Sequence, residues 1–312
     1  MRRHILPADV PRDQPFTVAQ ARAVGLTRTQ LEGASYRQLL HSVYVCADVP
    51  DSELLRAQAA SLVLPDDAVV GLASAAWLLG ADVLDARRPG LFVIANRGDQ
   101  IRRAGVHATS ALLSPGDVTE VHGVPVTTPV RTAFDLARRK DLVEAVVGVD
   151  AMLNRGGCRL DDLAAYTADH RKWRYVRTVD EALRQAEPLS ESPMETRQRM
   201  RLIFAGLPRP EAQVPVRDSS GFAFAYIDNG YEEWMVGADY DGGDHEKTWK
   251  KDLERQERVR DEGWWHRRYT SLHINRGATQ MCRQVRNALQ RAGWRPPAMR
   301  SPLSPIMRNY VV

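Results

Sequence analysis

The C-terminal third of the chain contains the stretch Trp234-Met235-Val236-Gly237-Ala238-Asp239-Tyr240-Asp241-Gly242, which follows Ala225-Tyr226-Ile227-Asp228 and precedes His245. Side chains alternate between the two faces of a β-strand, so a strand over 234–241 places Asp239 and Asp241 on one face. An adjacent strand lies about 5 Å away and brings Asp228 beside them. Carboxylate oxygens grouped in this way are the ligands that Mg²⁺ or Mn²⁺ prefers. The stretch therefore predicts a strand with a metal site at its end.

The same residues also have a plain structural explanation. Asp241 caps its own turn and Gly242 tolerates a positive φ, so the pair is a common signal for a strand that ends in a turn. Composition alone leaves both interpretations open.

Residues from about Glu191 to Ile274 resemble the very-short-patch-repair-like endonucleases, a branch of the PD-(D/E)xK nuclease superfamily. The matching segments are Glu191-Ser192-Pro193-Met194-Glu195-Thr196-Arg197, Ile227-Asp228, Asp239-Tyr240-Asp241-Gly242 with His245, and Gly263-Trp264. The resemblance implies a restriction-endonuclease-like mixed sheet flanked by helices, which hydrolyses DNA phosphodiesters with Mg²⁺ or Mn²⁺. The family usually ends its second strand with Glu-Tyr-Asp-Gly, so Asp239 stands where a glutamate is expected.

The resemblance assigns a role to each candidate catalytic residue. Asp228 and Asp239 would ligate the metal, and Glu195 would turn toward the site from the opening helix. Asp241 would ligate or orient, and His245 would assist the attacking water. Glu195 is also explained fully as part of a capping box, because it stands at the third helical position after a serine cap.

Two helix starts lie within residues 16–31. Each is a capping box in which a threonine is followed three residues later by a glutamine, at Thr17–Gln20 and Thr27–Gln30. Gly25 breaks the chain between them, and Leu39–Val45 is predicted as a strand. The pattern predicts a winged helix-turn-helix.

A winged helix-turn-helix places its second helix in the major groove of DNA. On this hypothesis Arg28, Thr29 and Gln30 face the base edges, while Arg37 and His41 approach the backbone from the wing. The same pattern also fits a helical hairpin that only packs against the rest of the chain.

Residues from about Phe16 to Asn154 look like the N-terminal region of AbiEi-type antitoxin and regulator proteins. The most specific match is Gly123-Val124-Pro125-Val126-Thr127-Thr128-Pro129-Val130-Arg131-Thr132-Ala133-Phe134-Asp135-Leu136-Ala137. The resemblance implies a DNA-binding regulator with a possible cognate toxin. From its residues the segment is a short strand followed by an amphipathic helix, on which Arg131 and Asp135 are spaced for an ion pair at the helix surface.

The whole chain is predicted to be α/β. Helical patterns at 54–64, 74–79 and 142–153 alternate with strand patterns at 91–95, 106–108 and 124–127. The predicted domains are a winged helix-turn-helix at 1–50, an AbiEi-like α/β region at 51–186, a PD-(D/E)xK nuclease-like domain at 190–292 and a basic tail at 293–312. Residues 187–192 are short, polar and proline-containing, as expected of a linker.

The charge distribution is consistent with a nucleic-acid partner. The net charge is +4 and the isoelectric point is near 9.0. Residues 271–312 contain seven arginines and no Asp, Glu or Lys. Such an end usually contacts phosphate or remains a solvated tail.

The three cysteines, Cys46, Cys158 and Cys282, are far apart in the sequence. They support neither a zinc ribbon nor a disulfide framework. The N-terminus lacks the apolar core of a signal peptide, and the longest weakly polar run is too short to span a bilayer. We therefore expect a cytoplasmic protein that does not enter a membrane.

Two functional hypotheses follow. The first is a DNA-binding protein with a metal-dependent endonuclease domain. The second is a transcriptional regulator or antitoxin whose nuclease-like domain is degenerate, and the aspartate at position 239 is its best support. Both predict DNA binding, and only the first predicts cleavage.

Overall fold

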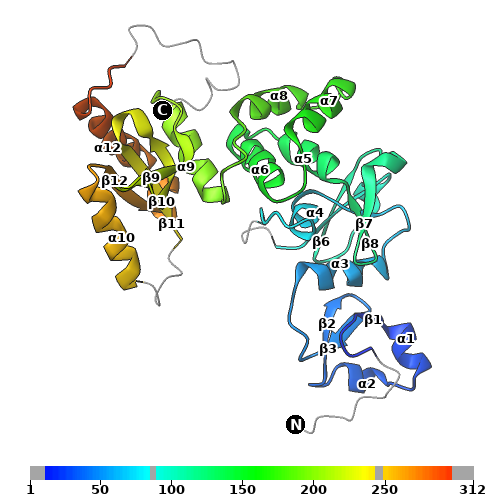
Figure 1. The fold of residues 1–312 in the computed structure, drawn as a ribbon. Coiled ribbons are helices and arrows are strands. Elements are labelled where there is room, and N and C mark those ends of the chain that lie inside the picture. Colours follow the sequence, from blue (N-terminus) through cyan, green and yellow to red (C-terminus); the bar gives the residue numbers. More distant parts are fainter. Residues whose placement is uncertain (1–10, 85–88, 243–248, 297–312) are drawn as a thin grey trace. The chain divides into compact units, whose positions relative to one another are not determined.

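The structure, a computed structural model, describes residues 11–84, 89–242 and 249–296 (Figure 1). Its helices and mixed sheets give the α/β class that the sequence predicts. Contacts divide the chain into two compact units. The first comprises Met1–Asp135 with Arg155–Tyr166, and the second comprises Leu136–Asn154 with Thr167–Val312.

The chain begins with two short helices and a three-stranded sheet. The elements are β1 (Phe16–Thr17), α1 (Val18–Ala23), α2 (Arg28–Leu31), β2 (Tyr36–Leu40) and β3 (Val43–Cys46), with strand order β1-β3-β2. Both predicted capping boxes are present. Leu26 and Leu31 are buried against Phe16 and Tyr36, so the two helices close over a small core of their own.

The single strand predicted over Leu39–Val45 is wrong. Ser42 has a φ of 67° and breaks it, and β2 and β3 pair antiparallel on either side of this turn. The sequence around His41 and Ser42 contains no glycine or asparagine, the residues that usually mark a tight hairpin. The apolar residues on either side of the turn therefore read as one continuous strand.

The middle of the chain forms a five-stranded mixed sheet in the order β6-β5-β4-β8-β7. Its elements are α3 (Glu53–Ser61), β4 (Val69–Val70), α4 (Leu72–Leu78), β5 (Leu91–Ala95), β6 (Val106–Ser110), β7 (Val118–Val121) and β8 (Val124–Thr127). The strands predicted at 91–95 and 124–127 are confirmed with the same bounds. The predicted helices are confirmed with small shifts at their ends.

Arg131 lies on α5 (Pro129–Ala137) and is completely buried. Its Nε donates to Asp135 Oδ2 at 2.6 Å, and its Nη1 donates to Asp117 Oδ2 at 3.0 Å. The Tyr166 hydroxyl donates to the other oxygen of Asp117 at 2.7 Å. The predicted pair of Arg131 and Asp135 therefore exists, but its predicted place on the helix surface is wrong, because two acidic groups and a tyrosine enclose the guanidinium.

The second unit joins a group of helices to a four-stranded sheet of order β12-β11-β10-β9. The helices before the sheet are α6 (Leu142–Asn154), α7 (Leu160–Asp169, which begins in the first unit), α8 (Val176–Gln185) and α9 (Pro193–Phe204). The remaining elements are β9 (Glu211–Arg217), β10 (Ala223–Tyr231), β11 (Val236–Asp241), α10 (Trp249–Asp261), β12 (Trp265–Thr270), α11 (Ser271–Asn275) and α12 (Ala278–Arg291). Among the described strands of this sheet, β11 and β12 pair in parallel, and the other neighbours pair antiparallel.

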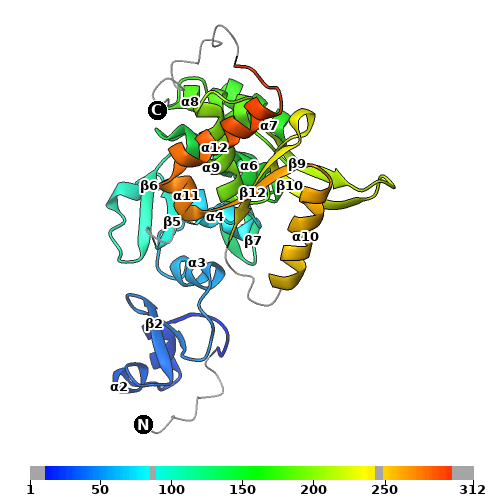
Figure 2. The same cartoon turned by 90° about the vertical axis from the view of Figure 1, so that its left-hand side faces the viewer.

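Helices cover both faces of this sheet. On one face, Leu202 of α9 and Leu289 of α12 pack with Val236 and Ala238. On the other, α10 lies beside β12 and packs through Val259 (Figures 1 and 2). The predicted strand start at Trp234 is wrong, since Glu232–Trp234 forms a short 3-10 turn and β11 begins at Val236.

The predicted linker is held in place by a buried ion pair. Asp150 of α6 lies 2.8 Å from Arg199 of α9 (Oδ2 to Nη2), and neither side chain is more than 1% exposed. The backbone N–H of Glu187 donates to Asp150 Oδ1 at 2.7 Å, and Arg199 Nη1 donates to Ser190 Oγ at 2.6 Å. Burial raises the pKa of Asp150, and Arg199 opposes that shift. Both ends of the segment at 187–190 are therefore fixed to the same pair of charges.

No helix within the described ranges is both long enough and apolar enough to cross a membrane.

Replacing Arg199 with methionine should lower the free energy of unfolding by about 3 to 5 kcal/mol, because it leaves the Asp150 carboxylate buried without its counter-ion. Arg197→Met on the same helix is the matched control. Arg197 pairs with Glu144 at 2.7 Å, but the two side chains are 23% and 34% exposed, so its loss should cost about 1 kcal/mol or less. Urea denaturation of the two variants measures both, and equal losses would contradict this account of Arg199.

Candidate functional site

The candidate site lies where β10 and β11 stop pairing. The antiparallel ladder runs from Tyr231 opposite Val236 to Asn229 opposite Ala238. Beyond it, side chains replace the backbone partners. The N–H of Asp228 donates to Asp239 Oδ1 at 3.0 Å, and the N–H of Tyr240 donates to Asp228 Oδ2 at 2.7 Å. The two predicted aspartates are thus held together by each other's strands.

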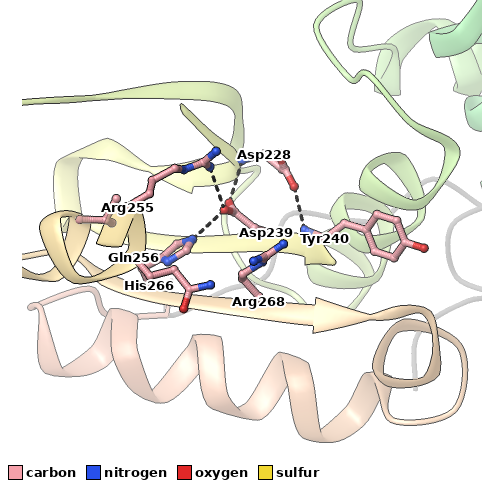
Figure 3. Close-up of a pocket in the computed structure, with 8 residues that line it drawn as sticks. Asp228, Asp239, Tyr240, Arg255, Gln256, His266 and Arg268 are labelled. Atoms are coloured by element: carbon pink, nitrogen blue, oxygen red, sulfur yellow. Dashed lines mark hydrogen bonds and ion pairs between the residues drawn. The ribbon is translucent and has the colours of Figure 1, made fainter. Parts of the chain in front are cut away.

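Asp239 is buried and faces two basic side chains (Figure 3). Its Oδ2 lies 2.8 Å from His266 Nε2 and 3.6 Å from Arg255 Nη2. The His266 side chain is only 4% exposed. Its Nε2 approaches Asp239 at an ion-pair distance but without the alignment of a hydrogen bond, so this nitrogen is a buried polar atom without a hydrogen-bond partner among the described residues.

The carboxyl of Asp228 has a strongly raised pKa. Burial first, and then the nearby carboxylates of Asp239 and Glu195, raise the pKa of this carboxyl, which comes to about 8. The Tyr240 N–H and Arg255 oppose the shift without cancelling it. The site therefore concentrates negative charge that its own donors compensate only in part.

Glu195, on α9, is the third carboxylate near this pair, and its charge contributes to the raised pKa of Asp228. Its N–H donates to Ser192 Oγ at 3.2 Å, which is the predicted helix cap. Its carboxylate accepts from the N–H of Glu191 at 2.8 Å, one residue before the cap, so the second half of the predicted capping box is displaced by one position. Gln213 Nε2 reaches the same oxygen at 3.4 Å, and burial raises the pKa of Glu195.

The other two predicted residues do not join the pair. Asp241 ends β11 with its Oδ1 at 3.4 Å from Arg268 and is absent from the lining of the pocket around Asp239. His245 lies outside the described residues. Within the described ranges, no three His, Cys, Asp or Glu side chains are grouped to hold a metal ion. Asp228 and Asp239 alone meet the minimum for Mg²⁺, which is commonly held by one or two carboxylates together with waters and phosphate oxygens.

The pocket encloses about 170 Å³. Its lining is Asp228, Asp239, Tyr240, Arg255, Gln256, Val259, His266 and Arg268. Its basic members, Arg255, His266 and Arg268, are not among the site residues predicted from the sequence. The parallel register places Arg268 opposite Asp239 and His266 opposite Gly237, so the alternation of β12 is the signal that identifies them once its partner strand is known.

The predicted DNA-binding residues fall into two groups. Arg28 and Thr29 are exposed on α2, and His41 is exposed in the β2–β3 turn. The side chains of Gln30 and Arg37 are already engaged. Gln30 Oε1 accepts the Thr27 N–H at 2.8 Å, and Arg37 Nη2 donates to the Val49 carbonyl at 2.9 Å.

Comparison with known proteins places an antitoxin-type domain in the chain. Residues 68–185 match the AbiEi antitoxin C-terminal domain. This confirms the predicted AbiEi resemblance for these residues and extends it past Asn154, although what matches is described as the C-terminal domain and not the N-terminal region. The match ends before the four-stranded sheet, so the nuclease resemblance of 191–274 stays a prediction.

Similar proteins occur in Mycobacterium tuberculosis. A stretch of 121 residues is 30% identical to the uncharacterized proteins Rv2248 of strain H37Rv and MT2308 of strain CDC 1551 / Oshkosh, covering 39% of this chain and 44% of each relative. The chain thus spans less than half the length of the curated relatives that it matches. The crystal structure of the Rv2827c protein from the same organism aligns over 59% of this chain and 74% of that chain, with a TM-score of 0.38 and 13% identity.

We expect the Asp228 carboxylate to make the wild type less stable at neutral pH than at acidic pH. Asp228→Asn should abolish this difference. The folded-state pKa of about 8 lies above the unfolded value of about 3.9. The folded protein therefore holds an extra proton between these values, and its stability falls as the pH rises through that window. Urea denaturation at several pH values should show the wild type losing on the order of a few kcal/mol that the asparagine variant keeps. If the stability of the two proteins changed with pH in the same way, the raised pKa of Asp228 would be contradicted.

Proposed function

We propose that this chain is a DNA-binding regulator of the antitoxin type, which reads duplex DNA with its N-terminal helices and acts with a cognate toxin. The observation that carries the proposal is the match of residues 68–185 to the AbiEi antitoxin C-terminal domain. Proteins of that kind pair a regulator with a toxin, and the nearby helix pair supplies a surface for DNA.

The N-terminal elements suit a winged helix-turn-helix. α1 and α2 are separated by Gly25, whose φ of 83° makes the turn between them, and the hairpin β2–β3 would form the wing. Leu31 fixes α2 to the core, while Arg28 and Thr29 point away from it as exposed residues. Arg28 is held by Glu32 at 2.8 Å, so its guanidinium is oriented along the helix surface before DNA is bound.

Arg28→Ala should weaken binding to the DNA upstream of the chain's own gene by about 1 to 3 kcal/mol, as expected for one base contact. Glu32→Ala is the matched control, since it removes the partner of Arg28 together with a negative charge, and it should preserve or strengthen binding. Gln30→Glu keeps the capping box but adds negative charge, and should weaken binding without unfolding α2. A mobility-shift titration in which Arg28→Ala binds like the wild type would exclude α2 as the recognition helix.

A second candidate function is metal-dependent hydrolysis of phosphodiesters, and the convergence of Asp228 and Asp239 favours it. These two carboxylates would hold the metal, which would neutralise phosphate charge and activate water. Arg255 and Arg268 line the same pocket and are placed to bind the phosphate. His266 would keep the Asp239 carboxylate in position. Glu195 and His245 keep their predicted roles as supporting groups.

Substitutions at Asp239 separate the two candidates. If the site is active, Asp239→Asn should abolish nicking with Mg²⁺ or Mn²⁺, because it removes a charged ligand at nearly constant shape. Asp239→Glu should keep or raise the activity, because the longer carboxylate restores the residue that the nuclease family uses. A wild type that cleaves no DNA or RNA, with cleavage appearing only in Asp239→Glu, would establish the site as degenerate.

A further inference from the structure

We propose that the groove between α10 and the outer edge of β12 binds the phosphate backbone of a single-stranded polynucleotide. The groove belongs to the second unit and is separate from the N-terminal helices. The proposal does not depend on duplex recognition by α2 or on hydrolysis, so a failure of either leaves it standing.

The groove consists of two adjoining pockets. The first is the acidic pocket around Asp239. The second encloses about 340 Å³ and is lined by Gln256, Arg260, Trp264, Trp265, His266, Arg267 and Arg268. Three of these, Gln256, His266 and Arg268, also line the acidic pocket. The two pockets therefore share a wall, and the arginine-rich one opens directly beside the carboxylates.

The second pocket has positive charge and no acidic lining residue. Arg260 on α10 and Arg267 on β12 are exposed. Among the described residues neither guanidinium has a hydrogen bond or an ion pair, in contrast to Arg268, which lies 3.4 Å from Asp241. A free planar guanidinium offers two parallel N–H donors that match the oxygens of a phosphate.

The shared wall contains the buried imidazole of His266. Its Nε2 lies 2.8 Å from Asp239 Oδ2, so the wall joins the second pocket to the carboxylates without offering a free donor. Arg267 and Arg268 are consecutive on β12, so their side chains lie on opposite faces of the strand, and a phosphate that contacts both would have to bind at the outer edge of the sheet.

The lining favours a nucleic-acid strand over an acidic protein. Protein interfaces depend on apolar side chains that the partner can bury, but Val259 and Trp264 are already buried in the core beneath α10. Trp265 lines the second pocket, lies on the same side of β12 as Arg267, and is half-buried because it also packs against the core that α12 covers. Arginines that follow a backbone, together with an aromatic ring, are the usual means of binding single strands. A single strand can also enter a recessed groove that a rigid duplex spans from outside.

The test measures binding of the full chain to a fluorescent single-stranded oligothymidylate over a range of salt concentrations. The double variant Arg260→Gln/Arg267→Gln should bind about tenfold more weakly, and its salt slope should be smaller by about 1.4, since each lost phosphate contact on a single strand removes about 0.7. Arg283→Gln/Arg291→Gln is the matched control. It makes the same change of net charge at exposed positions of α12 that line neither pocket, and should bind like the wild type.

Two further variants make the outcome decisive. Arg260→Lys/Arg267→Lys keeps both charges, so it should retain the salt slope and show that the glutamine variant is not merely unfolded, which circular dichroism checks directly. Arg28→Ala should leave oligothymidylate binding unchanged. Equal losses in the two glutamine doubles, no loss in either, or equal competition by polyglutamate would each overturn the proposal.

Discussion

Arg199 brings a positive charge into the interior of the second unit, and the arrangement of α9 follows from the way that charge is satisfied. Its guanidinium bonds Asp150 of α6, the Ser190 hydroxyl and the Gln185 carbonyl. At the preceding position of the same helix, Gln198 accepts from Asn229 at 2.9 Å and donates to the Asp239 carbonyl at 3.4 Å. Polar contacts therefore fix α9 both to the helices before the sheet and to the sheet. A buried pair of this kind contributes little net stability compared with apolar packing, but it strongly penalises arrangements in which either charge is left alone.

This arrangement links the helices before the sheet to the strands that carry the site. Asp150 lies on α6, within the segment that matches the antitoxin domain, and Asp239 lies on β11. The contacts run from Asp150 through Arg199 and Gln198 to the backbone of Asp239. A four-stranded sheet attached by a flexible linker would need no such chain of contacts. The helices before the sheet and the sheet itself thus share one set of buried polar contacts.

The sequence predicted the parts of this structure that depend on local patterns. The bounds of β5 and β8 follow from apolar runs that end at turn residues, and the approach of Asp228 to Asp239 follows from strand alternation and the spacing between strands. What could not be predicted depends on pairing between distant segments. His266 and Arg268 reach the aspartates only because β12 pairs in parallel with β11, and a parallel register has no local signature. Burial of Arg131 likewise required Asp117 and Tyr166, which lie far from it in the chain.

The charges around Asp239 decide whether this site can accept a metal ion. The carboxylates of Asp228 and Asp239 line one pocket, and a backbone N–H from the neighbouring strand donates to one oxygen of each. In a nuclease the remaining negative charge would be neutralised by a cation. Here Arg255 and His266 already lie close to Asp239 Oδ2, so a metal ion would have to compete with two basic side chains for that oxygen. The raised pKa of Asp228 shows that this internal compensation is incomplete. Metal binding would therefore require Arg255 to move, and its long, half-exposed side chain can leave the carboxylate at little cost, whereas the buried imidazole of His266 cannot.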